Sequence, residues 1–249
     1  MGIGSMSEQQ TATSRQSEPP SLPIGARRLT ALDRAFLGLL LLMVAGHLMA
    51  ARLAVGWWSA AALDGVAAIY LLAMSARREW RVLLARLFLL GLVAGVLELA
   101  TDAAGERFAH SLVYPAGEPS LWVSPVYMPF SWAIVLTQLG YLGWRLRGLV
   151  PPLRLWVAMA LTGVVGMLMV PFYEEMAYYA GWWHYASVWR IGHTPLYVLL
   201  FEGAIAAILP VLLSPRLTQR PLRFAALLGA IVGVWMPVAA LLSWLAIGH

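Results

Sequence analysis

The sequence contains no cysteine and no lysine, and it carries little charge for its length. Without cysteine the chain forms no disulfide, thiolate metal site or iron–sulfur cluster, and it attaches no haem covalently. Charged residues make up 12% of its 249 residues, about half the usual fraction of a soluble domain. The basic residues are arginines scattered in ones to threes between apolar runs, without a basic face or tract. This pattern excludes a nucleic-acid partner despite the net charge of +5.

Long apolar runs dominate what remains. Hydrophobic residues make up 61% of the chain, and the mean hydropathy is +0.73. Seven segments are each long enough to cross a bilayer, which takes about 20 residues of helix. We expect these spans at about residues 34–55, 57–76, 81–104, 122–145, 153–179, 193–214 and 221–247. The sequence therefore predicts an all-α polytopic membrane protein, in which residues 31–249 form a seven-transmembrane-helix bundle with short loops and antiparallel neighbours.

The first 30 residues differ from the rest of the chain. They are rich in Ser, Thr, Gln and Pro and have almost no apolar content, which predicts a disordered N-terminal tail over residues 1–30. The segment also lacks the apolar core and the small-residue cleavage site of a signal peptide.

Arginine is unevenly distributed between the two sides of the predicted bundle. One side holds Arg27, Arg28, Arg34, Arg77, Arg78, Arg81, Arg145, Arg147, Arg154, Arg216, Arg220 and Arg223. The loops of the opposite side hold only Arg52, Arg107 and Arg190. Because positive residues stay in the cytoplasm, we expect a cytoplasmic N-terminus and an external C-terminus. The expected location is a bacterial cytoplasmic membrane.

Ionisable residues gather in the outer half of the predicted bundle. Six carboxyl groups on four spans, with one histidine, fall at similar depth: Asp64, Glu98, Asp102, Glu174, Glu175, Glu202 and His47. A carboxylate at this depth is costly unless it faces the bundle interior, a cavity or a partner. The pattern predicts one polar pocket that opens towards the outer leaflet. The alternative for Glu174, Glu175 and Asp102 is an ordinary interfacial charge.

Two segments, SPVYMPFSW (Ser124–Trp132) and TPLYVLLFE (Thr194–Glu202), resemble each other. Each begins with a hydroxyl residue and Pro, which is typical of a helix N-cap and first turn, and each has Tyr two residues later. Helices starting there would point their positive dipole ends at the carboxylates. We interpret spans three–four and five–six as a duplicated unit, with chance similarity as the alternative.

Carboxyl groups in an apolar, aromatic pocket suit proton-initiated chemistry on an isoprenoid. A buried carboxyl group can stay protonated, and a second one nearby separates an acid from a base. Trp and Tyr faces hold a carbocation through their quadrupoles. We expect Glu98 and Glu202 as proton donor and partner, with Glu174, Glu175 and Asp102 as tuning groups or terminal base. The expected substrate-binding side chains are Tyr127, Trp132, Tyr178, Trp183, His193 and Tyr197.

Motifs for other chemistries are lacking. No two histidines stand four residues apart, no DxxxD run is present to bind a magnesium diphosphate, and neither a Walker A sequence nor a GxSxG elbow occurs. We therefore expect no metal. The spacing leaves open one alternative, a zinc site formed by His184, His193 and Glu174 or Glu175.

Short motifs between about residues 95 and 205 resemble known membrane enzymes. VPFYEEMAYY is similar to the Pro-x-Glu-Glu and aromatic motif of membrane lycopene cyclases of the heterodimeric and fungal fused type, with one extra residue before the acids. A second resemblance is to the first half of the carotenoid hydratase family, and it is carried by the series Glu98, Gly105, Tyr114, Pro125 and PFSW (Pro129–Trp132). EEMAYYAGWWHY and IGHTPLYVLLFEG are similar to its second half, from which Tyr185 and Glu202–Gly203 depart. Fungal meroterpenoid cyclases are similar in outline.

The resemblance implies a redox-neutral cyclase or hydratase that needs no cofactor and acts on a hydrophobic carotenoid or terpenoid among membrane lipids. It nominates Glu98 and Glu174 or Glu175 as acid or base. Two other functions remain as alternatives. One is a non-enzymatic accessory subunit of a membrane complex. The other is a transporter, which would need polar groups in the inner half of the bundle, where the sequence has almost none.

Overall fold

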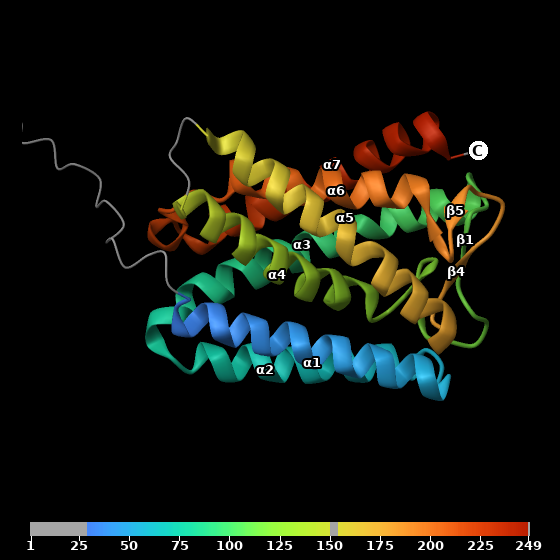
Figure 1. Cartoon of the computed structure of the whole chain (residues 1–249), viewed down its shortest axis with the longest axis horizontal. Coiled ribbons are helices and arrows are strands. Elements are labelled where there is room, and N and C mark those ends of the chain that lie inside the picture. Colours follow the sequence, from blue (N-terminus) through green and yellow to red (C-terminus); the bar gives the residue numbers. More distant parts are fainter. Residues whose placement is uncertain (1–28, 150–153, 249) are drawn as a thin grey trace, which may run out of the picture.

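The computed structural model describes residues 29–149 and 154–248 (Figure 1). The predicted tail, residues 1–30, lies outside this part of the chain except for its last two residues. Seven α-helices occur in the described residues: α1 (Ala31–Leu53), α2 (Trp58–Ser75), α3 (Arg78–Arg107), α4 (Met128–Leu149), α5 (Leu155–Ala180), α6 (Leu196–Leu212) and α7 (Leu222–Ile247). A short 3₁₀ helix, Leu217–Gln219, precedes α7.

The helices have the surface of a membrane protein. Five of them, α1, α2, α3, α5 and α7, are long and apolar enough to cross a bilayer, and α6 is a shorter apolar helix. Leu41, Leu72 and Leu168 are exposed, whereas Glu98 and Asp102 are buried. This inverts the arrangement of a soluble protein, in which acidic side chains are rarely buried and leucines usually are. The structure thus supports a mostly helical, polytopic membrane protein.

Glycines let the helix pairs α3–α4 and α5–α6 approach closely. A Cβ atom added to Gly91 of α3 would lie 2.8 Å from the Cα atom of Ala133 in α4. One added to Gly166 of α5 would lie 2.6 Å from the Cβ atom of Ala206 in α6. Small residues at such positions allow backbone-to-backbone packing, which is how helices associate in a membrane. These two tight pairs carry most of the acidic residues.

Short strands lie together at one end of the bundle (Figure 1). β1 (Leu112–Val113) pairs antiparallel with β4 (His184–Tyr185) and so joins the loop after α3 to the loop after α5. β2 (Ser120–Leu121) and β3 (Ser124–Pro125) form a hairpin before α4. β5 (Arg190–Ile191) and β6 (Thr194–Pro195) form a second hairpin before α6.

The two hairpins have the same geometry, so the repeat visible in the sequence is also present in the structure. The backbone N–H of Val126 donates to the Pro119 carbonyl over 3.0 Å, and that of Leu196 donates to the Trp189 carbonyl over 2.9 Å. Trp122 and Gly192, at the same place in each hairpin, both have left-handed backbone, with φ of 63° and 61°. Helix, strand, hairpin and helix therefore occur twice in the same order.

The predicted helix starts at Ser124 and Thr194 are wrong. Both residues lie in strands, and α4 begins only at Met128, well after the predicted start of span four. The Ser-Pro and Thr-Pro pairs have extended backbone because Pro at the second position disfavours helical backbone at the residue before it. The hydroxyl residues are therefore buried strand residues and not N-caps.

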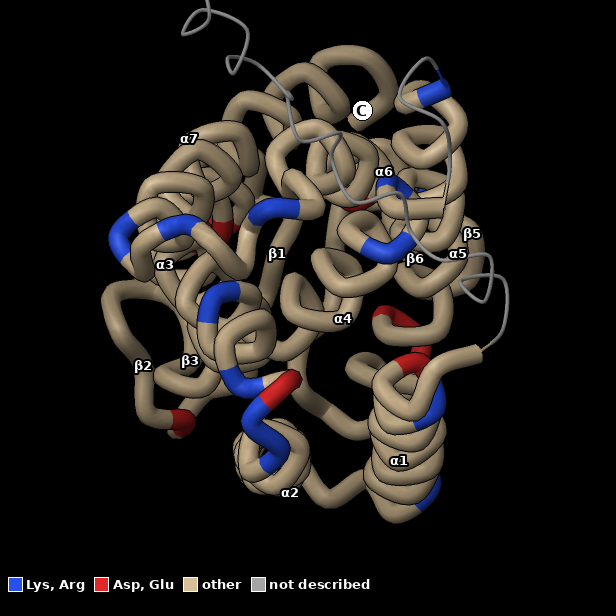
Figure 2. The backbone as a smooth tube through the Cα atoms, turned by 90° about the vertical axis from the view of Figure 1, so that its left-hand side faces the viewer, with Lys and Arg blue, Asp and Glu red and all other residues tan. Residues whose placement is uncertain are grey.

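The opposite end of the bundle is rich in arginine. Figure 2 looks onto this end, and arginine segments lie at the near ends of several helices. Arg145 forms an ion pair with Asp33 at 3.1 Å, and Tyr141 donates a hydrogen bond to the same carboxyl group over 2.5 Å. These contacts connect the last turns of α4 to the first turn of α1.

Candidate functional site

A cavity of about 300 Å³ lies inside the bundle, towards the end that carries the strands. Each of the seven α-helices contributes to its wall, together with Leu112 of β1 and Tyr185 of β4. Five of the six carboxyl residues singled out in the sequence line it: Asp64, Glu98, Asp102, Glu174 and Glu202. His47, from α1, lines it as well. Side chains that come from separate helices, and that the sequence places at similar depth in the membrane, thus line one cavity.

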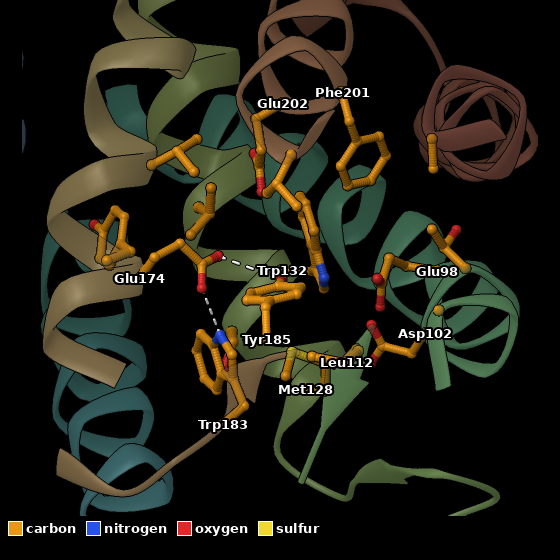
Figure 3. A pocket seen from close by; sticks show the side chains of 18 of the residues that line it. Glu98, Asp102, Leu112, Met128, Trp132, Glu174, Trp183, Tyr185, Phe201 and Glu202 are labelled. Carbon is orange, nitrogen blue, oxygen red and sulfur yellow. Dashed lines mark hydrogen bonds between the residues drawn. The ribbon is translucent and has the colours of Figure 1, made fainter. Parts of the chain in front are cut away.

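Glu98 and Asp102 form one acidic pair in this cavity. They lie one turn apart on α3 and face each other (Figure 3). Both are buried, and Glu98 interacts electrostatically with Asp102 and with Glu202. Tyr114 donates a hydrogen bond to Asp102 Oδ2 over 2.6 Å. Glu98 Oε2 is buried and has no hydrogen-bond partner among the described residues, so this atom is free to meet a bound molecule.

Glu174 is oriented from the loop that follows its own helix. Trp183 Nε1 donates to Glu174 Oε2 over 2.8 Å, and the Tyr185 hydroxyl donates to Oε1 over 3.5 Å (Figure 3). Gly181, which ends α5 with a φ of 73°, turns the chain back so that both donors reach the carboxyl group. A residue with a side chain is strained at this φ, which explains glycine there.

The remaining two carboxyl groups come from α2 and α6. Ser131 of α4 donates a hydrogen bond to Asp64 Oδ2 over 2.5 Å. Glu202 of α6 interacts electrostatically with Glu174. In Figure 3, Glu174 and Glu202 approach from one side, and the pair Glu98–Asp102 approaches from the other.

Aromatic side chains fill the space between the acids. Trp132, Trp183, Tyr185, Tyr197 and Phe201 line the cavity. Trp132 and Phe201 meet edge to face, with ring centroids 6.3 Å apart. The Tyr197 hydroxyl is 3.1 Å from the Ser111 hydroxyl and hydrogen-bonded to it. The wall therefore offers several ring faces near the carboxyl groups.

The tyrosines of the loops act as hydrogen-bond donors to these acids. Tyr114 follows β1 and Tyr185 lies in β4, so both are outside the helices. Burial raises the pKa of Tyr114 and of Tyr185 well above the ordinary value, and nearby carboxyl groups raise it further. Both hydroxyls therefore keep their protons and can donate them in hydrogen bonds.

Four residues predicted for the site lie outside the cavity wall. Glu175 accepts hydrogen bonds from the backbone N–H of His193 over 2.8 Å and from its Nδ1 over 2.7 Å. The His193 ring stacks on Tyr178, with centroids 3.5 Å apart. Since successive helix residues point about 100° apart, Glu174 and Glu175 cannot face the same space. Glu175, His193 and Tyr178 therefore do not share the cavity with the other acids, contrary to the expectation from the sequence.

Tyr127 is the fourth such residue. It is buried between the β3 strand and the first turn of α4, beside Glu118, and it does not line the cavity. By contrast, Trp132, Trp183 and Tyr197 do line it, as predicted.

The sequence predicts only part of the set of residues that meet in the cavity. Asp64 and His47 stand out by their depth but have no predicted role, and Tyr114 and Tyr185 are not among the predicted site residues. His47 Nδ1 lies 2.7 Å from the Met43 carbonyl oxygen, and its ring meets the edge of Tyr173 at 4.9 Å. A loop tyrosine has no depth signal in the sequence, because only the β1–β4 pairing brings it to the acids.

The described residues hold no group of three or more His, Asp or Glu side chains arranged to bind a metal ion. The zinc alternative required His184, His193 and Glu174 or Glu175 to converge. Instead, His184 lies exposed in β4, and His193 pairs with Glu175 outside the cavity. The cavity therefore presents carboxyl groups and rings as its chemical groups.

Comparison with known proteins places the chain in one family. A family model described as "Domain of unknown function (DUF6989)" matches residues 99–247. This range contains most of the duplicated unit, from the end of α3 through α7, with Asp102, Glu174 and Glu202. Neither the curated proteins nor the solved structures contain a significant match.

Proposed function

We propose a function for this chain, which belongs to the DUF6989 family of domains of unknown function. It is an integral membrane cyclase or hydratase that protonates an alkene or epoxide of an isoprenoid lipid. The site is the cavity that contains Asp64, Glu98, Asp102, Glu174 and Glu202.

One observation carries the proposal: acids from four helices converge on one apolar, ring-lined cavity. Burying several carboxyl groups in a membrane protein costs free energy, and such groups are a functional site by default. Had these side chains pointed separately to lipid or to water, no shared chemistry would follow. Their convergence supports catalysis by proton transfer.

Glu98 is the proposed proton donor. Two buried carboxyl groups that face each other, as Glu98 and Asp102 do, cannot both be ionised, so one of them stays protonated. Glu98 carries that proton on Oε2, the oxygen without a hydrogen-bond partner among the described residues, and gives it to a carbon of the substrate double bond or to an epoxide oxygen. With an alkene, the π electron pair forms the new C–H bond. With an epoxide, an oxygen lone pair forms the O–H bond, and a C–O bond then breaks with its electron pair going to oxygen. Either step leaves a carbocation. Glu202, which interacts with Glu98, is the partner acid.

The cation is held and then quenched inside the cavity. The faces of Trp132, Tyr197 and Phe201 stabilise positive charge without reacting with it. In cyclisation, a second double bond attacks the cation to close a ring, and the carboxylate of Glu174 removes a proton to restore a double bond. In hydration, a water oxygen attacks instead, and Glu174 takes a proton from that water. Both outcomes are redox-neutral, and neither requires a cofactor.

Glu174 suits the role of base because its direction is set by two donors, Trp183 and Tyr185. A carboxyl group with fixed orientation presents its lone pairs to one part of the cavity.

The proposed topology has all seven helices crossing the membrane, with the arginine-rich end in the cytoplasm and the strand end outside. The length of α4 and the apolar character of α6 support the count of seven. A bacterial cytoplasmic membrane is the proposed location.

The test is product analysis in cells that make linear carotenoids or open-chain terpenoid precursors. We expect a product with the mass of the precursor, if the enzyme is a cyclase, or with one added water, if it is a hydratase. Glu98→Gln and Glu202→Gln should abolish it, while Glu106→Gln, at an exposed residue of the same helix, should not. Full conversion by the first two variants would overturn the proposal. If the wild type itself converts no precursor and co-purifies stoichiometrically with another membrane protein, the accessory-subunit alternative is supported instead.

A further inference from the structure

The wall of the cavity is exposed at one place. Among the described residues that line it, only Ala104, Phe108 and Leu241 have exposed side chains. Phe108 is 84% exposed and Leu241 is 56% exposed. Ala104 and Phe108 lie at the C-terminal end of α3, and Leu241 lies in α7. The cavity therefore reaches the surface between these two helices.

The course of α7 explains this gap. Gly229 and Gly233 pack closely on α3, where added Cβ atoms would lie 2.4 Å from the Leu90 carbonyl oxygen and 2.6 Å from Leu97 Cβ. Pro237 follows one turn later, and a proline inside a helix removes a hydrogen bond and kinks the axis. Figure 1 shows the last turns of α7 standing apart from the bundle. The two helices thus touch in one half and separate in the other.

Apolar and small side chains surround the gap. From α3 and its end come Ala104, Gly105, Phe108 and Ala109, and from α7 come Pro237, Ala240, Leu241 and Trp244. Both helices are long and apolar enough to span a bilayer, and the α7 side of the gap, residues 237–244, lies within the last predicted span, so the gap opens into the outer leaflet. An opening of this composition suits an acyl or isoprenoid chain rather than a water-soluble molecule.

We propose that a neutral long-chain isoprenoid enters the cavity sideways from the bilayer, through the gap between the C-terminal end of α3 and the kinked half of α7. The inference rests on the proposed function for its substrate class. From Gly105 inwards, Asp102 and Glu98 follow on successive turns of α3, so the entering end meets these acids first. The substrate is neutral because these carboxyl groups repel an anionic headgroup such as a diphosphate.

A cross-link across the gap tests the proposal, and the absence of native cysteine makes it specific. Phe108→Cys and Leu241→Cys are introduced together, and the protein is reconstituted in phosphatidylcholine vesicles with a diazirine derivative of geranylgeraniol. Photolabelling of peptides that contain Trp132 or Phe201 is measured by mass spectrometry before and after reaction with a bis-maleimide. We expect labelling before the cross-link and its loss afterwards.

The control pair links the same helices away from the gap. The pair is Leu97→Cys and Val234→Cys. Leu97 packs against Gly233, Val234 is the next residue of α7, and neither Leu97 nor Val234 lines the cavity. Cross-linking this pair should leave labelling unchanged. As a second variant, Ala240→Trp fills the gap and should abolish labelling, while Leu242→Trp, on the exposed face of α7, should not.

The outcomes distinguish the route by which the substrate enters from the reaction that follows in the cavity. Labelling that persists after the Phe108–Leu241 cross-link and in Ala240→Trp overturns the lateral opening. Lack of labelling in the unlinked protein overturns the isoprenoid as the molecule that enters. Labelling that the cross-link blocks, without any cyclised or hydrated product, leaves the opening in place and contradicts only the proposed reaction.

Discussion

Trp183 donates its indole N–H to Glu174 over 2.8 Å, whereas Glu175, the next residue, is bound to His193. The two adjacent glutamates of α5 thus have different environments: Glu174 lines the cavity, and Glu175 lies outside it. Glu174 is buried, and Glu175 fastens the β5–β6 hairpin to the end of α5. The pair therefore provides a matched comparison between a cavity acid and a structural one.

Replacing each glutamate by glutamine should separate the two roles. Glu174→Gln removes the proposed terminal base, and we expect conversion to fall by about 10²-fold or more, the usual contribution of a general base. Glu175→Gln keeps an oxygen that accepts the His193 N–H bond and should retain conversion. Product yield per mole of folded protein is the measurement. Equal losses in both variants would contradict the assignment of Glu174 to the cavity chemistry.

Tyr114→Phe should lower stability through Asp102. The variant removes the 2.6 Å hydrogen bond to the buried Asp102 carboxyl group, and a buried group that loses its partner costs about 1–3 kcal/mol. Thermal unfolding in detergent measures the loss. The control is Tyr179→Phe, at an exposed ring of α5, which should unfold like the wild type. An unchanged unfolding temperature for Tyr114→Phe would show that this bond contributes little.

Glu118, in the loop before β2, should make stability depend on pH. Burial raises the pKa of its carboxyl group from 4.5 to about 7, although the nearby Tyr127 hydroxyl opposes part of this rise. The folded protein therefore binds a proton more tightly than the unfolded chain, so this contribution is fully present below pH 4.5 and is lost as the pH rises to about 7.

The unfolding temperature, measured between pH 4.5 and 8, should thus decrease more steeply for the wild type than for Glu118→Gln, because glutamine does not titrate. Glu106→Gln, at an exposed residue, should follow the wild-type profile. A Glu118→Gln profile parallel to that of the wild type would contradict the burial of this carboxyl group.

Two glycines test how closely the helices pack. Gly91→Ala places a Cβ atom 2.8 Å from the backbone of Ala133, where neither backbone can yield, and overpacking of this kind costs about 1–3 kcal/mol. Gly65→Ala, in α2, meets nothing within 4 Å and should be neutral or stabilising, since alanine favours helix over glycine. Unfolding in detergent compares the two. A Gly91→Ala variant as stable as Gly65→Ala would contradict the close α3–α4 contact.

Most helix positions could be predicted because an apolar run of about 20 residues has few alternatives in a membrane. The starts of α4 and α6 were the exceptions: Ser124-Pro125 and Thr194-Pro195 favour a helix start locally, but pairing with Ser120–Leu121 and with Arg190–Ile191 makes them strands. The duplication was visible in the matching Ser/Thr-Pro-x-Tyr segments, because the same hairpin requires similar residues twice.

The sequence by itself determined the membrane character, the approximate helices and the depth of the acids, because hydrophobic length and charge position depend only on the order of residues. Which acids meet was decided by the tertiary structure. Rotation about each helix axis separates Glu174 from Glu175, and the β1–β4 pairing brings Tyr114 and Tyr185 to carboxyl groups on two different helices. Such relationships arise from packing between distant segments, and a one-dimensional pattern of residues does not contain them.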